Sequence, residues 1–123
     1  MKLEFFEPDY SVCQLSPETS LPSWALREFL AIVRTDDELT IIAPTSVVPK
    51  DIIAQHDFVC FRVSGNLAFD VVGVIATISS VLAKAKIPIL SISTYNTDYF
   101  LVSRSNQEPA RLALISAGHE FQP

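Results

Sequence analysis

The sequence predicts an α+β fold in which two related halves each combine an antiparallel sheet with short helices. An apolar stripe at helical spacing occupies residues 71–85, and β-rich runs lie on both sides of it. Each half also contains a pair of β-rich runs joined by a short polar turn. With 123 residues, 49% of them hydrophobic, the chain is long enough and apolar enough to form a packed core.

The second half shows the clearer order of elements. An apolar strand is expected at Phe58–Val63, followed by the turn residues Ser64-Gly65-Asn66. Asp70 suits the N-cap of the next helix, and Pro88 follows that helix. The stripe that defines the helix consists of Val71, Ile75, Ile78, Leu82 and Ala85.

Two strands and a second helix complete this half. The strands are expected at Ile89–Tyr95 and Tyr99–Arg104, around the turn Asn96–Asp98. The helix is expected at Asn106–Ala117, with a capping box formed by Ser105 and Glu108 and a stop at Gly118. Residues His119–Pro123 fit either a short last strand or a tail.

The first half looks like a reduced copy of the second. We expect an edge strand at Leu3–Phe6, ended by Pro8, and a further strand at Tyr10–Leu15. One short helical turn is expected at Pro22–Leu26, because nearby prolines disfavour a longer helix. A hairpin is expected at Phe29–Thr35 and Glu38–Ala43, and a short helix at Lys50–Gln55.

This order is that of the ferredoxin-like split βαβ arrangement. The acid that opens the second strand of the hairpin occurs in both halves, as Glu38-Leu39 and as Asp98-Tyr99. We therefore expect two tandem subdomains, residues 1–56 with a reduced helix and residues 57–123, packed as one unit.

Composition excludes several functional classes. The net charge is −5, and no basic stripe suggests a nucleic-acid surface. No apolar run approaches the roughly 20 residues that span a bilayer, and the N-terminus does not read as a signal peptide, so we expect a cytoplasmic protein. Cys13 and Cys60 are expected to be buried thiols, and neither histidine has metal-ligand spacing. No cofactor motif and no activated nucleophile is apparent.

Two segments could form a small-molecule site. Gly73 is expected in the first turn of a helix, where the missing Cβ would let a ligand reach the free N–H groups of residues 72–74, although close packing on a neighbouring strand explains the glycine equally well. The polar run 93–98 ends at Asp98, whose carboxylate could accept from an ammonium group. A self-contained polar hairpin is the alternative interpretation of that run.

These two segments resemble the ACT domain family. The similar stretches are 69–76, which reads FDVVGVIA, and 87–102, which reads IPILSISTYNTDYFLV. The resemblance is closest to aspartokinase ACT modules and to CASTOR-type arginine sensors, and it covers about Asp57–Gly118. Residues 21–43 resemble, less closely, the first module of small bacterial proteins with two ACT modules.

The resemblance implies a non-catalytic regulatory protein that binds an amino acid between two ACT modules. It assigns the ligand site of one module to Val71, Val72, Gly73, Val74, Ser93, Thr94, Tyr95 and Asp98. The facing module would contribute Pro88, Ile89 and Leu90, most simply from the second subunit of a homodimer.

One residue departs from the arginine-binding relatives. Those relatives carry an acid where this chain has Val71, which offers a guanidinium no partner. The expected ligand is therefore a smaller or neutral amino acid rather than arginine. Two alternatives stay open: an interaction module with an empty site that docks on a partner enzyme or transporter, and a small enzyme that uses Asp98 and Tyr95.

Overall fold

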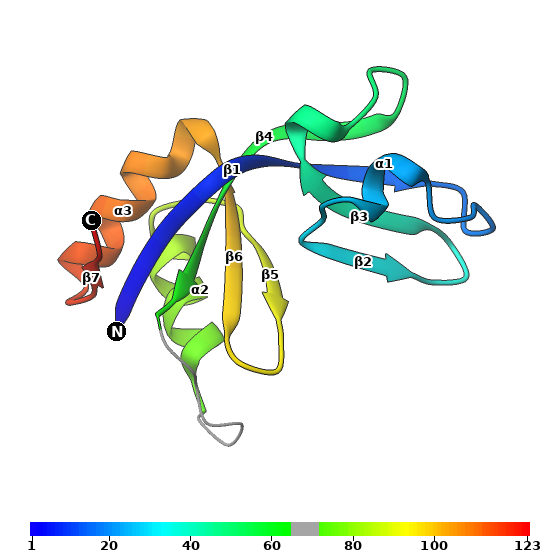
Figure 1. Ribbon diagram of the computed structural model, residues 1–123. Coiled ribbons are helices and arrows are strands. Elements are labelled where there is room, and N and C mark those ends of the chain that lie inside the picture. Colours follow the sequence, from blue (N-terminus) through cyan, green and yellow to red (C-terminus); the bar gives the residue numbers. More distant parts are fainter. Residues whose placement is uncertain (65–71) are drawn as a thin grey trace. The chain divides into compact units, whose positions relative to one another are not determined.

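The computed structural model describes residues 1–64 and 72–123, which form two compact units (Figure 1). Unit 1 contains Met1–Glu7 and Val59–Pro123, and unit 2 contains Pro8–Phe58. The strands β1 (Lys2–Leu15) and β4 (Ile53–Val63) each contribute residues to both units. The first seven residues therefore belong with the second half of the chain, whereas the sequence predicts them to lie in the first subdomain, residues 1–56.

Unit 1 has a complete βαββαβ order. After β4 come α2 (Val74–Lys84), β5 (Leu90–Ser93), β6 (Asp98–Ser103), the 3₁₀ turn η2 (Arg104–Asn106), α3 (Gln107–Ser116) and β7 (Glu120–Phe121). The strand order is β7-β1-β4-β6-β5, with β5 antiparallel to β6 and β7 parallel to β1. The start of β1 thus lies between β7 and β4, which are the last and the first strand of the ferredoxin-like βαββαβ order.

Unit 2 repeats this order in a reduced form. After β1 come α1 (Ser23–Leu26), β2 (Ala31–Arg34), β3 (Leu39–Pro44) and the 3₁₀ turn η1 (Thr45–Val47), and the unit closes with the start of β4. The strand order β2-β3-β1-β4 matches the order β5-β6-β4-β1 of unit 1. The predicted fold class is therefore confirmed, including the reduced helix of the first half, because α1 has 4 residues and α2 has 11.

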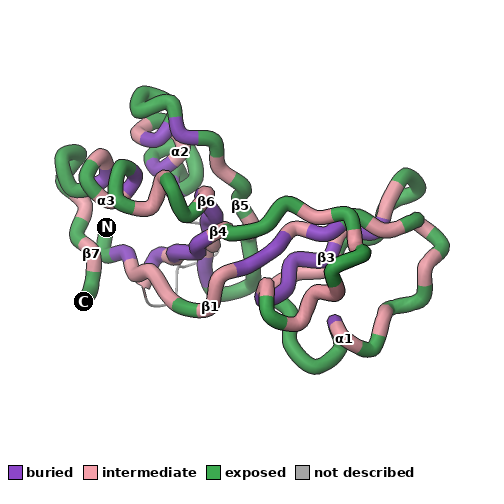
Figure 2. The backbone as a smooth tube through the Cα atoms, turned by 90° about the horizontal axis from the view of Figure 1, so that it is seen from above, coloured by how far each residue is buried: buried purple, intermediate pink, exposed green. Residues whose placement is uncertain are grey.

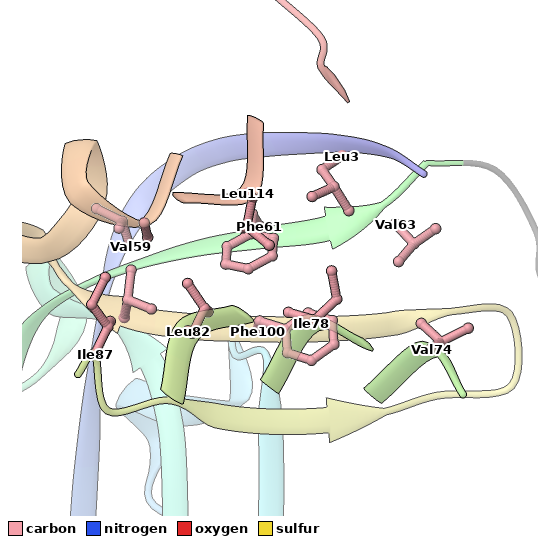
Figure 3. Packing of buried hydrophobic residues seen from close by; sticks show 12 residues of the cluster. Leu3, Val59, Phe61, Val63, Val74, Ile78, Leu82, Ile87, Phe100 and Leu114 are labelled. Atoms are coloured by element: carbon pink, nitrogen blue, oxygen red, sulfur yellow. The ribbon is translucent and has the colours of Figure 1, made fainter. Parts of the chain in front are cut away.

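Each unit has its own hydrophobic core, and buried residues recur along the strands and on one side of α2 and α3 (Figure 2). In unit 1, alternate residues of β4 and β6 face the helices, so that Phe61 and Phe100 stack with ring centroids 5.2 Å apart (Figure 3). In unit 2, the core consists of Cys13, Ala25, Leu39, Ile41 and Ala43. Both cysteines are buried, as predicted.

The predicted break at Pro8 is wrong, because β1 runs without interruption from Lys2 to Leu15. Leu3–Phe6 is also not an edge strand, since β7 pairs with β1 on the side away from β4. The Phe121 ring of β7 stacks on Phe5 with centroids 4.9 Å apart. A two-residue strand at the end of the chain therefore covers what the sequence presents as an edge.

The predicted helix at Lys50–Gln55 is also wrong, because β4 already begins at Ile53. Ile52 and Ala54 pack on the core of unit 2, whereas Ile53 between them is 72% exposed. This alternation has a period of two, which is typical of a strand. The run is too short for sequence periodicity alone to separate strand from helix.

The two helices of unit 1 start differently from the prediction. α2 begins at Val74 and buries Val74, Ile78 and Leu82, whereas Ile75 of the predicted stripe is 39% exposed. Gly73 is its N-cap, and the predicted cap Asp70 lies outside the described residues. α3 has no side-chain cap, so the capping box is not formed.

The two signals predicted for the ends of α3 differ in outcome. Glu108, predicted to close the capping box, pairs with Arg111 instead. The helix stops at Gly118 as predicted.

Candidate functional site

Gly73 occupies the N-cap position of α2 in the left-handed backbone region, with φ 85° and ψ 2°. A Cβ built on this residue would meet no atom of the described residues within 4 Å, and the left-handed backbone conformation by itself favours glycine here. Its carbonyl accepts from the Thr77 N–H at 2.8 Å, and no side chain in the described part of the chain caps the helix. The free donors at this helix end are therefore those of residues 74–76, two residues later than predicted.

The polar run forms a tight turn between β5 and β6. The N–H and Oγ1 of Thr94 both donate to the Thr97 carbonyl at 2.9 Å. Ser93 Oγ donates to Asp98 Oδ1 at 2.7 Å, across the register pair of the two strands. The hydroxyls of Ser93 and Thr94 are thus used inside the hairpin, while Asp98 Oδ2 has no partner among the described residues.

One buried hydrogen bond ties this turn to the end of β4. Thr97 is 6% exposed, and its Oγ1 donates to the Val63 carbonyl at 3.0 Å. Val63 and Val74 belong to the same core cluster, and both lie at the end of the sheet where β5 turns into β6 (Figure 3). The structure therefore brings the start of α2 and the turn 94–97 to the same end of unit 1.

Ser64 is a polar residue at this end that the sequence marked only as turn chemistry. Its Oγ is buried and has no hydrogen-bond partner among the described residues. Buried hydroxyls are nearly always paired with protein or water, so an unpaired one needs an explanation. Nothing in the sequence separates Ser64 from an ordinary turn serine, because its burial depends on tertiary packing.

The other predicted site residues differ in accessibility. Val74 is 8% exposed and can offer a ligand only its backbone, whereas Val72 is 90% and Tyr95 is 85% exposed. Val71 lies outside the described residues.

The predicted facing segment Pro88–Leu90 lies next to Ile87, at the opposite end of the sheet from Val74 (Figure 3). It leads into β5, the last strand in the order of unit 1, and Leu90 is 38% exposed. One copy of unit 1 therefore does not join Pro88–Leu90 to Gly73.

Burial makes both thiols poor nucleophiles. It raises the pKa of Cys60 to about 12 and also raises the pKa of Cys13. In the described part of the chain, no three metal-ligating side chains of His, Cys, Asp or Glu come together. No helix within residues 1–64 and 72–123 has the length and apolar character that crossing a membrane requires.

Comparisons with known proteins agree with this geometry. The sequence profile of the ACT domain matches residues 53–116, just over half of the chain, and a profile describing an N-terminal domain matches residues 8–51. A search of curated proteins gave no match.

Three solved structures are similar over nearly the whole chain. Protein Atu0741 from Agobacterium tumefaciens is 32% identical, with a TM-score of 0.91, over 98% of this chain and 91% of its own. VC0802 from Vibrio cholerae, described as a "possible transport protein", is 20% identical, with a TM-score of 0.78 and coverage of 94% and 88%. A structure of aspartokinase alpha and beta subunits is 16% identical, with a TM-score of 0.69 and coverage of 95% and 97%. The βαββαβ order of unit 1 and the profile match together show that this chain belongs to the ACT domain family.

Proposed function

We propose that this protein is a regulatory module that binds a free amino acid at the end of unit 1 where Gly73 and Asp98 lie. The observation that carries the proposal is the left-handed Gly73. It starts α2 with no side-chain cap from the described residues, at the same end of the sheet as the turn before Asp98. Uncapped N–H groups at a helix start attract an anion, and a free carboxylate oxygen attracts a cation.

The chemistry of the ligand follows from these two groups. Its carboxylate would accept from the N–H groups of residues 74–76, and its ammonium would donate to Asp98 Oδ2. The Ser64 hydroxyl, which has no partner among the described residues, is a candidate for a further hydrogen bond. Because Val71 offers no charge, a small or neutral side chain fits better than a guanidinium.

The same site needs a second copy of the module. Pro88–Leu90 lies at the far end of the sheet, and β5 has no strand on its outer side in the strand order of the described chain. A homodimer that pairs two units about a two-fold axis would place this segment opposite Gly73 and create two equivalent sites.

The proposal is tested by screening the twenty amino acids by thermal shift and then measuring each positive by calorimetry. A ligand at about 100 times its Kd adds roughly 2.7 kcal/mol to the free energy of unfolding, which such a screen detects. Asp98→Asn should abolish the shift, and Asp37→Asn in the exposed hairpin of the first half should leave it intact.

A glycine pair controls for backbone strain. Gly73 has φ 85° and Gly118 has φ 97°, and neither has a neighbour within 4 Å of a built Cβ. Alanine should therefore cost similar stability at both positions, but only Gly73→Ala should weaken ligand binding. Equal effects of both variants on binding, or no amino acid that binds, would contradict the proposal.

A module with an empty site is the second candidate. The observation that favours it is the hairpin itself, because Ser93 and Thr94 already satisfy their hydroxyls within it. Such a module would dock on a partner enzyme or transporter. Stable capture of one partner protein without added amino acid, together with a negative screen, would support this candidate.

A further inference from the structure

A second group of polar side chains lies on the helix-free face of the sheet of unit 1. Residues 59, 61 and 63 of β4 face the helices, so Arg62 points to the opposite face. Its Nε donates to Glu4 Oε1 at 2.7 Å, and its Nη1 donates to the Tyr99 hydroxyl at 3.4 Å. The guanidinium also lies over the Phe6 ring, 5.6 Å from its centroid.

These contacts come from three neighbouring strands and hold the guanidinium in place. Glu4 and Phe6 lie on β1, Arg62 on β4 and Tyr99 on β6. The rings of Phe6 and Tyr99 meet edge to face at 5.8 Å. The hydrogen bonds that Arg62 donates to Tyr99 and Glu4 raise the pKa of Arg62, so the group stays charged.

The ion pair is left incomplete on its outer side. Glu4 uses one oxygen on Nε, so Nη2 of Arg62 and Oε2 of Glu4 have no partner among the described residues. The side chains are still accessible, with 42% of Arg62 and 27% of Glu4 exposed. The pair therefore leaves one donor, Nη2 of Arg62, and one acceptor, Oε2 of Glu4, for a ligand.

A second ion pair in the same unit shows the contrast. Arg111 binds both oxygens of Glu108, with Nε–Oε2 at 2.9 Å and Nη2–Oε1 at 2.6 Å. That pair lies within one helix turn, and both carboxylate oxygens are used. It provides an internal control for an ordinary surface ion pair.

We propose that the group of Glu4, Phe6, Arg62 and Tyr99 is a weak binding site for a small zwitterion that carries a carboxylate and an ammonium. The unpaired Nη2 of Arg62 and the Tyr99 hydroxyl donate to the carboxylate, and Glu4 Oε2 accepts from the ammonium. An anion alone would leave this neutral pair with a net negative charge on a protein of net charge −5, whereas a zwitterion adds no charge. This inference does not depend on the site at Gly73.

The test uses glycine as the minimal zwitterion, with acetate and methylammonium as half-ligands at equal ionic strength. The Arg62 Nε–H resonance, followed by NMR during titration, should shift and saturate with glycine and respond much less to either half-ligand. The Arg111 Nε–H resonance should not move. Asp98→Asn should leave the Arg62 response unchanged, which separates this site from the one proposed at Gly73.

Two substitutions test the roles of the charges. Arg62→Lys keeps the charge but loses the fork, and glycine binding should weaken by roughly tenfold or more. Glu4→Gln removes the ammonium partner and the repulsion toward anions, so acetate should then bind at least as well as glycine. A shift that does not saturate, equal responses to acetate and glycine in the wild type, or a parallel response at Arg111 would overturn the proposal.

Discussion

At the residue scale, two positions with left-handed backbone end the helices of unit 1. Lys86, two residues after the end of α2, has φ 60°, and Gly118, two residues after the end of α3, has φ 97°. Both ends have the paired hydrogen bonds of a Schellman motif: the Ile87 N–H donates to the Leu82 carbonyl at 2.9 Å, and the His119 N–H donates to the Leu114 carbonyl at 3.0 Å. Only α3 has the glycine that this conformation favours.

Lys86→Gly is therefore expected to stabilise the protein. The substitution relieves the crowding of Cβ at positive φ, and part of that gain is lost to the greater freedom of glycine in the unfolded chain. We expect about 0.5–1 kcal/mol of added stability in chemical unfolding. Gly118→Ala should shift stability in the opposite direction, and a loss of stability in both variants would contradict this explanation.

His119 gives the stability a defined pH dependence. Partial burial and, to a lesser degree, the Met1 ammonium, whose nitrogen lies 2.9 Å from Nδ1, lower its pKa below the usual 6.5. The unfolded chain then binds the proton more readily, so stability falls as the pH drops below about 6.5 and levels off under the folded-state pKa. Tm measured between pH 7.5 and 5 should fall more for the wild type than for His119→Gln, and parallel curves would refute the assignment.

At the element scale, local sequence signals predicted most of the fold of unit 1. The hairpin turn at Asn96–Asp98, the helix stop at Gly118 and the burial of Cys60 all follow from residue types and their spacing. The start of α2 did not, because Ile75, which is 39% exposed, extends the apolar spacing beyond the buried face. Both Val74 and Ile75 are spaced to share a helix face with Ile78 and Leu82. Which of the two is buried depends on the strands beneath the helix, and the sequence does not show where those strands lie.

The candidate site was predictable to a similar extent. Gly73 and Asp98 stand out in the sequence, and the structure places the start of α2 and the turn before Asp98 at one end of the sheet. The bond from Thr97 to Val63 that ties the turn to β4 was not predictable, because it joins residues 34 positions apart. The unpaired hydroxyl of Ser64 likewise appears only after folding.

The buried face of α2 should dominate its contribution to stability. Leu82 is fully buried in the core of unit 1, whereas Leu112 on α3 is 52% exposed. Leu82→Ala should cost about 2–5 kcal/mol of unfolding free energy through lost burial and a residual cavity. Leu112→Ala should change it by less than about 1 kcal/mol, and similar losses for the two variants in denaturant titrations would show that the helix faces are misassigned.

At the scale of the whole molecule, the chain repeats one topology and shares two strands between the repeats. β1 gives Leu3, which is fully buried, to the core of unit 1 and Cys13 to the core of unit 2. A fragment of residues 57–123 would therefore lack part of its own core. The two repeats therefore share strands, because β1 and β4 each contribute residues to both units.

Binding of an amino acid between the start of α2 and the turn before β6 is the central element of the proposed function. Backbone amide NMR during titration with the amino acid selected by thermal shift tests this claim directly. We predict saturable shifts for the amides of Gly73, Val74 and residues 94–98, with Asp98→Asn abolishing them and Asp37→Asn having no effect. Shifts confined to other parts of the chain, or none with any of the twenty amino acids, would contradict it.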